Sequence, residues 1–116
     1  MLDPEIPTHF RTKVTLEHIL PQRPSPRSEW MKKIPDGAKR QELSQLLGNF
    51  TILTSKMNPR ASNFDFHKKR EKIFGTSESN VFPLTAELVK YDDWTEVEIR
   101  ERHQQLTGMA RHILKV

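Results

Sequence analysis

The segment PQRPSPR at residues 21–27 most constrains the fold, because it places three prolines within seven residues. Proline lacks a backbone N–H and fixes φ, so neither a central strand nor a helix interior can run through this segment. We therefore expect an extended loop here. The preceding run, KVTLEHIL at 13–20, alternates in the manner of a β-strand, and Pro21 ends it.

The other predicted elements are one strand and several helices. Residues 49–54, NFTILT, favour a second strand through their β-branched and aromatic side chains. The order predicts an α+β fold with a small ββα core, additional helices and a mostly helical C-terminal part. The first two predicted helices cover about 29–34, with Ser28 as cap, and 38–47, followed by Gly48. A third runs from a cap at Ser62 or Asn63 to about Phe74, and a short fourth covers 85–90. The C-terminal helix starts at a D-x-x-E capping pattern formed by Asp93 and Glu96.

Length and composition exclude several classes of protein. A chain of 116 residues fits one small domain, which we place at 13–116, and residues 1–12 with two prolines resemble an arm or a linker remnant. The absence of cysteine excludes disulfides, thiolate zinc sites and cysteine nucleophiles. No run approaches the ~18 apolar residues of a membrane span, and no signal-peptide core is present. A cytoplasmic protein without a membrane partner is expected.

The net positive charge is concentrated in residues 56–72. This segment holds six lysines and arginines against two acidic residues, an excess equal to the net charge of +4 of the whole chain. A local basic patch is suited to binding phosphates, although a solvated helix face explains the segment equally well when it is taken alone. The residues expected to contact DNA are Lys56, Arg60, Lys68, Arg70 and Lys72.

Polar residues fall where the two predicted strands would meet. If the strands pair antiparallel, His18 at the end of the first lies beside Asn49 at the start of the second. A helix packed back across this hairpin would bring Asn58 near Glu17. Adjacent residues of a regular strand point to opposite faces, so Glu17 and His18 can share one site only if the strand bends or ends there. Pro21, close behind, makes such an ending plausible.

These residue types suit phosphodiester hydrolysis. A neutral histidine can take a proton from water near pH 7, so His18 is the candidate general base. Mg²⁺ or Mn²⁺ prefers oxygen ligands, so Glu17 and Asn58 are the candidate ligands of one divalent ion. A cation such as Lys69 or Lys68 could offset the charge that develops on the phosphate.

Four sequence motifs together resemble one nuclease family. They are EHILPQ at 17–22, LGNFTILT at 47–54, NPRASNFDFHKK at 58–69, and a W-x4-I-x2-R pattern at Trp94, Ile99 and Arg102. The chain resembles the HNH (His-Me finger) nucleases, in the branch found at the C-terminus of GmrSD-type modification-dependent restriction enzymes. The resemblance implies a ββα-metal core, DNA cleavage in a restriction or phage-defence protein, and an N-terminal sensor or NTPase domain or subunit outside this chain.

The resemblance also implies roles for individual residues. His18 matches the general base, and Glu17 stands where many relatives have an aspartate that binds the metal. Asn49 matches a central asparagine that braces the hairpin, and Asn58 matches a helix-side metal ligand. The remaining matches are Asn63 and Lys69, which follow the pattern of the branch, with Lys69 placed in the catalytic set.

Other interpretations of the same residues remain open. Asn63 is also an ordinary helix cap, and Arg102 is expected to support the structure through a buried ion pair. Trp30 and Trp94 are expected to anchor the core. Two alternative functions are a catalytically inactive nucleic-acid-binding module of the same fold and a protein-interaction domain that docks through its basic helix.

Overall fold

The computed structural model describes residues 13–57 and 63–113. The elements confirm the predicted α+β class, with two strands early in the chain and helices throughout its C-terminal part. They are β1 (Val14–His18), α1 (Glu29–Lys33), α2 (Gly37–Ser44), η2 (Leu47–Asn49), β2 (Phe50–Thr54), α4 (Phe66–Lys69), η3 (Arg70–Phe74), η4 (Ser79–Val81), α5 (Pro83–Ala86), η5 (Glu87–Lys90) and α6 (Glu96–Ile113). None of the described helices combines the length and apolar composition needed to cross a bilayer.

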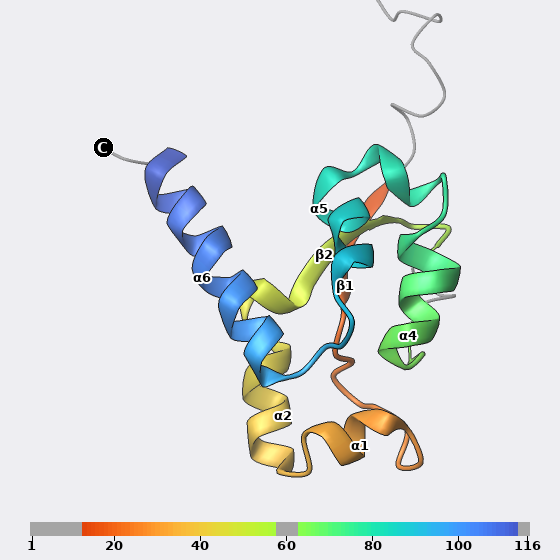
Figure 1. Cartoon of the computed structure of the whole chain (residues 1–116), viewed down its shortest axis with the longest axis vertical. Helices are drawn as coiled ribbons and strands as arrows, with labels where there is room; N and C mark the ends of the chain where they lie inside the picture. The colour runs from red at the N-terminus through yellow and green to blue at the C-terminus, as the bar shows by residue number, and fades with distance from the viewer. Residues whose placement is uncertain (1–12, 58–62, 114–116) are drawn as a thin grey trace, which may run out of the picture.

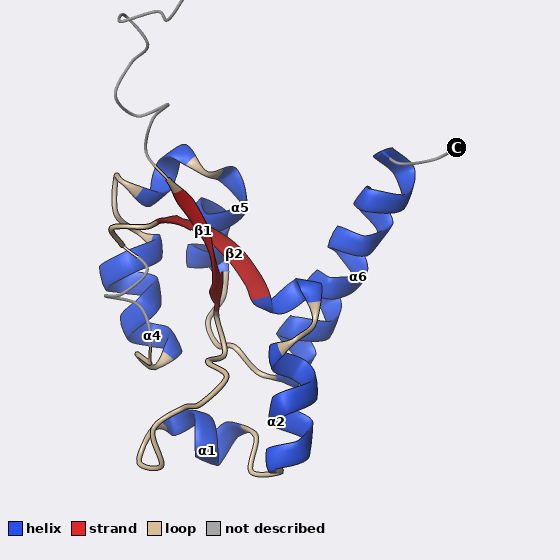
Figure 2. Cartoon of the chain, turned by 180° about the vertical axis from the view of Figure 1, so that it is seen from behind, coloured by secondary structure: helices blue, strands red, loops and turns tan. Residues whose placement is uncertain are grey.

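The strands β1 and β2 form an antiparallel hairpin in which His18 pairs with Phe50 and Val14 with Thr54. The end of β1 therefore lies beside the start of β2, as the sequence predicts. The hairpin occupies the middle of the molecule, with α4 on one side and α6 on the other (Figures 1 and 2). The succession β1, β2, α4 has the predicted ββα order, while a metal-binding core of that type stays a prediction.

Large aromatic side chains form the centre of the core. Trp30 and Trp94 are fully buried, which confirms their expected role as core anchors. Phe66 of α4 stacks on Trp94 with ring centroids 5.5 Å apart. Each indole N–H also has a partner, because Trp30 donates to the Phe64 carbonyl and Trp94 donates to the Asn49 side chain. The core thus fixes α1 and α4 relative to the hairpin.

Two predicted helix starts are wrong. The helix α4 begins at Phe66 behind Asp65, rather than at a cap formed by Ser62, which lies outside the described residues, or by Asn63. Asp65 is extended and accepts the Glu29 N–H at 3.1 Å, which ties it to α1. At α6 the capping pair is Thr95 and Glu98 rather than Asp93 and Glu96, since the Glu98 carboxylate accepts the Thr95 N–H at 2.7 Å.

The end of α2 also differs from the prediction. The helix stops at Ser44, and the following residues form the short turn η2. Gly48 in this turn lies directly against α6, where an added Cβ would stand 2.3 Å from the Ile99 carbonyl oxygen. Gly48 is therefore required for the close approach of two backbones rather than for helix termination.

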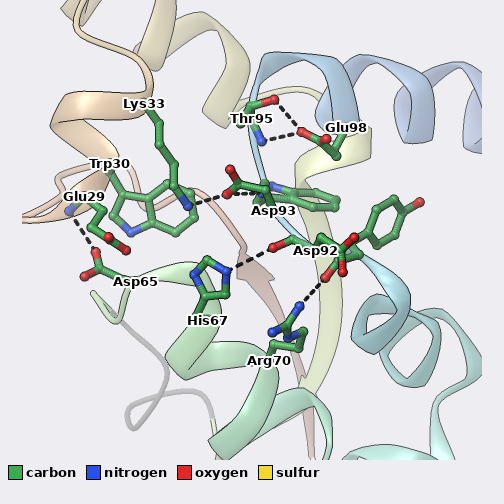
Figure 3. A network of polar contacts seen from close by, with 12 residues as sticks. Glu29, Trp30, Lys33, Asp65, His67, Arg70, Asp92, Asp93, Thr95 and Glu98 are labelled. Carbon is green, nitrogen blue, oxygen red and sulfur yellow. Dashed lines mark hydrogen bonds and ion pairs between the residues drawn. The ribbon is translucent and has the colours of Figure 1, made fainter.

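A polar network joins α1, α4 and the segment before α6 (Figure 3). Because its members come from three separate parts of the chain, it fixes the position of α4 beside the hairpin. Its contacts are Lys33 Nζ to Asp93 Oδ1 at 2.6 Å, a ring nitrogen of His67 to the Asp92 carbonyl at 3.0 Å, and Arg70 Nη1 to the Tyr91 carbonyl at 2.7 Å.

Candidate functional site

A polar pocket of ≈ 220 Å³ lies at the end of the hairpin. It brings together Glu17, His18 and Asn63, three of the residues singled out from the sequence. Glu17 and His18 are adjacent in the chain, yet both line it, because β1 ends at His18 and the alternation of strand side chains does not continue. The residues that line the polar pocket are Glu17, His18, Pro21, Gln22, Arg23 and Asn63.

Asn49 is completely buried and braces the segment that follows His18. Its Oδ1 accepts the Leu20 N–H at 2.8 Å and the Trp94 indole N–H at 3.1 Å. Its Nδ2 donates to the carbonyls of Leu20 at 2.9 Å and Ser44 at 3.1 Å. The side chain therefore uses its full hydrogen-bonding capacity to fix the backbone two residues beyond the candidate base.

Lys69 is buried behind the polar pocket and does not line it. Its Nζ lies 2.9 Å from Glu17 Oε2, 2.8 Å from the His18 carbonyl and 2.8 Å from the Ile19 carbonyl. An ammonium group has three N–H donors, so these three contacts leave none for a substrate. Lys69 thus connects α4 to the end of β1, and Asn49 binds the backbone of Leu20, the residue after Ile19.

Burial shifts the pKa values of this group. Burial raises the pKa of Glu17 and lowers the pKa of Lys69, and the attraction between the two charges only partly opposes both shifts. Burial, followed by the nearby Lys69 charge, lowers the pKa of His18. The imidazole is therefore neutral near pH 7, which is the protonation state that a general base needs.

The surroundings of His18 leave one of its polar atoms without a partner. Its ring packs against Phe50 with centroids 4.4 Å apart. Its Nε2 is buried and has no hydrogen-bond partner among the residues that the structure describes. An unpaired buried polar atom is costly, and this nitrogen has no exposed surface through which a water molecule or a ligand could reach it.

The described donors fit a hard cation only sparsely. Within residues 13–57 and 63–113 no three His, Cys, Asp or Glu side chains gather as a metal site. The polar pocket offers the Glu17 carboxylate, of which Oε2 already contacts Lys69, together with the polar atoms of its other lining residues. Asn58, the second expected ligand, lies outside the described residues. This set suits an ion that keeps most of its water, as Mg²⁺ does.

The expected DNA-binding residues differ in their surroundings. Lys56, Lys68 and Lys72 are exposed, and Lys68 Nζ lies 4.1 Å from the centre of the Phe64 ring. Arg70 is half-buried and donates to the Tyr91 carbonyl. Arg60 lies outside the described residues. The exposed part of the predicted patch therefore comes from the turn after β2 and from the helical segment 66–74.

Arg102 supports the start of β2 without the expected ion pair. It is buried, and its Nη1 donates to the carbonyls of Gly48 at 2.8 Å and Phe50 at 2.6 Å. In the described part of the chain no carboxylate pairs with it, so the predicted buried ion pair is wrong. Backbone carbonyls accept its Nη1 and Nη2 donors instead, while its buried Nε has no hydrogen-bond partner among the described residues.

Arg23 also lines the polar pocket but is not among the site residues predicted from the sequence, and Pro21 and Gln22, which line it too, enter that prediction only as part of the EHILPQ motif. Their place in the chain, directly after EHIL and within the proline loop, was the available indication. A residue three to five positions beyond a candidate base can return to it when the chain turns at the strand end.

Comparison with known proteins identifies a family. The sequence model described as "GmrSD restriction endonucleases, C-terminal domain" matches residues 3–109, which is most of the chain. The match confirms the resemblance noted from the four motifs. No curated protein and no solved structure shows a significant match to this chain.

Proposed function

The chain belongs to the family of GmrSD restriction endonuclease C-terminal domains, and on this premise we propose that it cleaves DNA as an HNH-type endonuclease domain. The observation that carries the proposal is the shared position of Glu17 and His18 in one polar pocket. A carboxylate and a neutral imidazole at one opening are the groups that metal-dependent phosphodiester hydrolysis needs.

In the proposed reaction His18 takes a proton from a water molecule while the water oxygen bonds to phosphorus. The bond from phosphorus to the leaving sugar oxygen breaks, and that oxygen receives a proton from solvent. Asn49 and Lys69 keep the His18 segment in place through the contacts described above. Glu17 and Asn58 would hold one Mg²⁺ or Mn²⁺, which supplies Lewis-acid stabilisation of the developing charge when bound.

We further propose that exposed cations outside the polar pocket bind the DNA backbone. Lys56, Lys68 and Lys72 are available for this from their exposure, and Arg60 joins them as a prediction. Contacts of this kind position a duplex without reading its sequence. In a restriction protein of the cytoplasm, residues 13–116 would supply the cleavage and a sensor or NTPase domain or subunit would supply the control.

A plasmid assay tests the proposal. Supercoiled DNA is incubated with wild-type protein, His18→Ala and the control His112→Ala, in Mg²⁺, Mn²⁺ or EDTA. His112 is exposed in the last turn of α6, so its removal should leave cleavage intact. Loss of the base should reduce metal-dependent cleavage by about 10²–10⁴-fold.

The same assay separates the alternatives. Cleavage that His18→Ala leaves unchanged would refute the proposed base. Salt-sensitive DNA binding without metal-dependent cleavage by wild type would identify an inactive binding module. Absence of DNA affinity at moderate salt would favour a protein-interaction domain.

A further inference from the structure

Arg23 supplies a cation to the polar pocket. It is exposed, and it lines the same pocket as Glu17 and His18. Among residues 13–57 and 63–113, none forms an ion pair or a hydrogen bond with its guanidinium. Its donors are therefore available to a ligand, in contrast to those of the buried Lys69, whose three N–H groups all have partners inside the protein.

The backbone that carries Arg23 is held in place before any ligand binds. Leu20, three residues earlier, is fixed through both its N–H and its carbonyl by the Asn49 side chain. Pro21 is buried, and Pro24 restricts Arg23 itself to extended conformations. The backbone from Leu20 to Arg23 is thus restricted at both ends, by Asn49 and by Pro24. This restriction lowers the entropy cost of placing the Arg23 guanidinium against a ligand.

The charge of Arg23 is the one that the polar pocket leaves uncompensated. The Glu17 carboxylate is balanced by the Lys69 ammonium at 2.9 Å. Pro21, Gln22 and Asn63 carry no charge, and the His18 imidazole does not contribute a negative one. With the Lys69 ammonium behind the lining balancing Glu17, the polar pocket has one positive charge in excess, that of the Arg23 guanidinium, and it favours an anion.

We propose that Arg23 is the residue that binds the phosphate undergoing cleavage. Its planar fork of N–H donors can contact two non-bridging phosphate oxygens at once and stabilise charge as the water oxygen attacks. Arg23 neither gains nor loses a proton in this step. The inference rests on the proposed nuclease function and assigns to Arg23 the phosphate contact that the sequence suggested for Lys69 or Lys68.

Arg27 provides a matched control for the kinetic test. It lies on the same proline loop, is exposed and does not line the polar pocket, so Arg27→Ala removes the same charge from the same loop. Single-turnover cleavage of a DNA duplex should fall by about 10²–10³-fold in Arg23→Ala, the range seen when one transition-state donor is removed. Arg23→Lys should recover part of the rate, and Arg27→Ala should stay within about threefold of wild type.

Equal rates for Arg23→Ala and Arg27→Ala, with wild type active, would overturn the assignment. Absence of His18-dependent cleavage in wild type would instead count against the proposed function.

A binding measurement then still tests Arg23. Inorganic phosphate is titrated into ¹⁵N-labelled protein in EDTA, and the arginine Nε–Hε NMR signals are followed. Saturable shifts at Arg23 with little change at Arg27 support the site, whereas equal shifts or none at Arg23 refute it.

Discussion

Two hollows on the same hairpin differ in composition. The polar pocket lies at its end, and an apolar groove of ≈ 330 Å³ lies beside its strands. The neighbours Leu16 and Glu17 line different hollows, because side chains of a strand alternate between faces. His18 lines the polar pocket and Phe50 lines the apolar groove, and the centroids of their rings are 4.4 Å apart. The apolar groove is lined by Leu16, Leu47, Phe50, Thr51, Ile52, Leu84, Leu106, Met109, Ala110 and Ile113.

The difference lies in what holds each lining in place. Behind the polar pocket, Asn49 and Lys69 bind backbone and carboxylate groups with no exposure to solvent. In the apolar groove, Leu16 is 65% exposed and Met109 is 54% exposed. Burial of polar groups is expensive, and a site for chemistry needs the rigidity that such contacts give. Substitutions behind the polar pocket should therefore cost stability, and those in the apolar groove should not.

The largest effect is expected for Lys69→Met. The variant leaves the Glu17 carboxylate buried without its cation, which should lower the free energy of unfolding by about 3–5 kcal/mol in urea titrations. Lys72→Met, which removes an exposed lysine three residues later, should change it by less than about 0.5 kcal/mol. Adding Glu17→Gln to Lys69→Met should recover part of the loss. Equal stability of Lys69→Met and Lys72→Met would show that the buried ion pair between Lys69 and Glu17 does not contribute to the free energy of unfolding.

Asn49→Ala is expected to have the next largest effect. It removes the partners of the Leu20 backbone, the Ser44 carbonyl and the Trp94 indole at once. Because each unsatisfied buried group costs about 1–3 kcal/mol, we expect a loss of about 3 kcal/mol in the free energy of unfolding. Cleavage should fall as well, measured at a temperature where the variant is folded. Stability matching that of the surface control Asn80→Ala would contradict the bracing role.

The apolar groove should tolerate polar side chains. Leu16→Thr and Met109→Gln replace exposed residues, so the free energy of unfolding should change by no more than about 0.5 kcal/mol. Rates of plasmid cleavage should match wild type, since neither residue lines the polar pocket. A tenfold loss of cleavage in a stable variant would show that the apolar groove belongs to the active site. That result would contradict the assignment of the chemistry to the polar pocket alone.

The smallest effect concerns Asp93, which belongs to the network of Figure 3 and lines neither hollow. Burial raises the pKa of this carboxyl, but its contacts with Lys33 and the Trp94 N–H outweigh burial and lower the pKa overall. A depressed pKa in the folded state adds stability above the unfolded value near 3.8, and the gain is lost as pH falls through the folded value. Asp93→Asn should thus be slightly less stable than wild type at pH 6, and the difference should shrink as the pH is lowered through the folded pKa of Asp93. A gap that widens on acidification would contradict this sign.

The sequence predicted the hairpin and its polar end because those features are local. Alternation ended by Pro21 placed β1, and β-branched residues placed β2. Antiparallel pairing then sufficed to bring His18 near Asn49, and Ile19 indeed donates to the Asn49 carbonyl at 2.8 Å. The local residue pattern of each strand, together with antiparallel pairing, was thus sufficient to predict the two strands that form the site.

The sequence could not predict contacts between side chains and backbone groups that are far apart in the chain. Lys69 is predicted as a cation that acts on the phosphate, yet it is buried and contacts the Glu17 carboxylate and the backbone carbonyls at the end of β1. Asp65 looks like a helix cap but binds the backbone of α1 instead. Arg23 could be recognised only after the loop path was known, because nothing in PQRPSPR shows that the chain returns to His18.

The most direct test of the contrast between the two hollows is the location of a bound divalent ion. Mn²⁺ at substoichiometric concentration broadens NMR signals of nuclei near it, and excess Mg²⁺ should reverse the effect. We predict selective broadening at Glu17, His18 and Arg23, with the signals of Met109 and Ile113 in the apolar groove unchanged. Broadening centred on the acidic face of α6, at Glu98 and Glu101, or spread evenly over the surface, would contradict a metal-dependent site in the polar pocket.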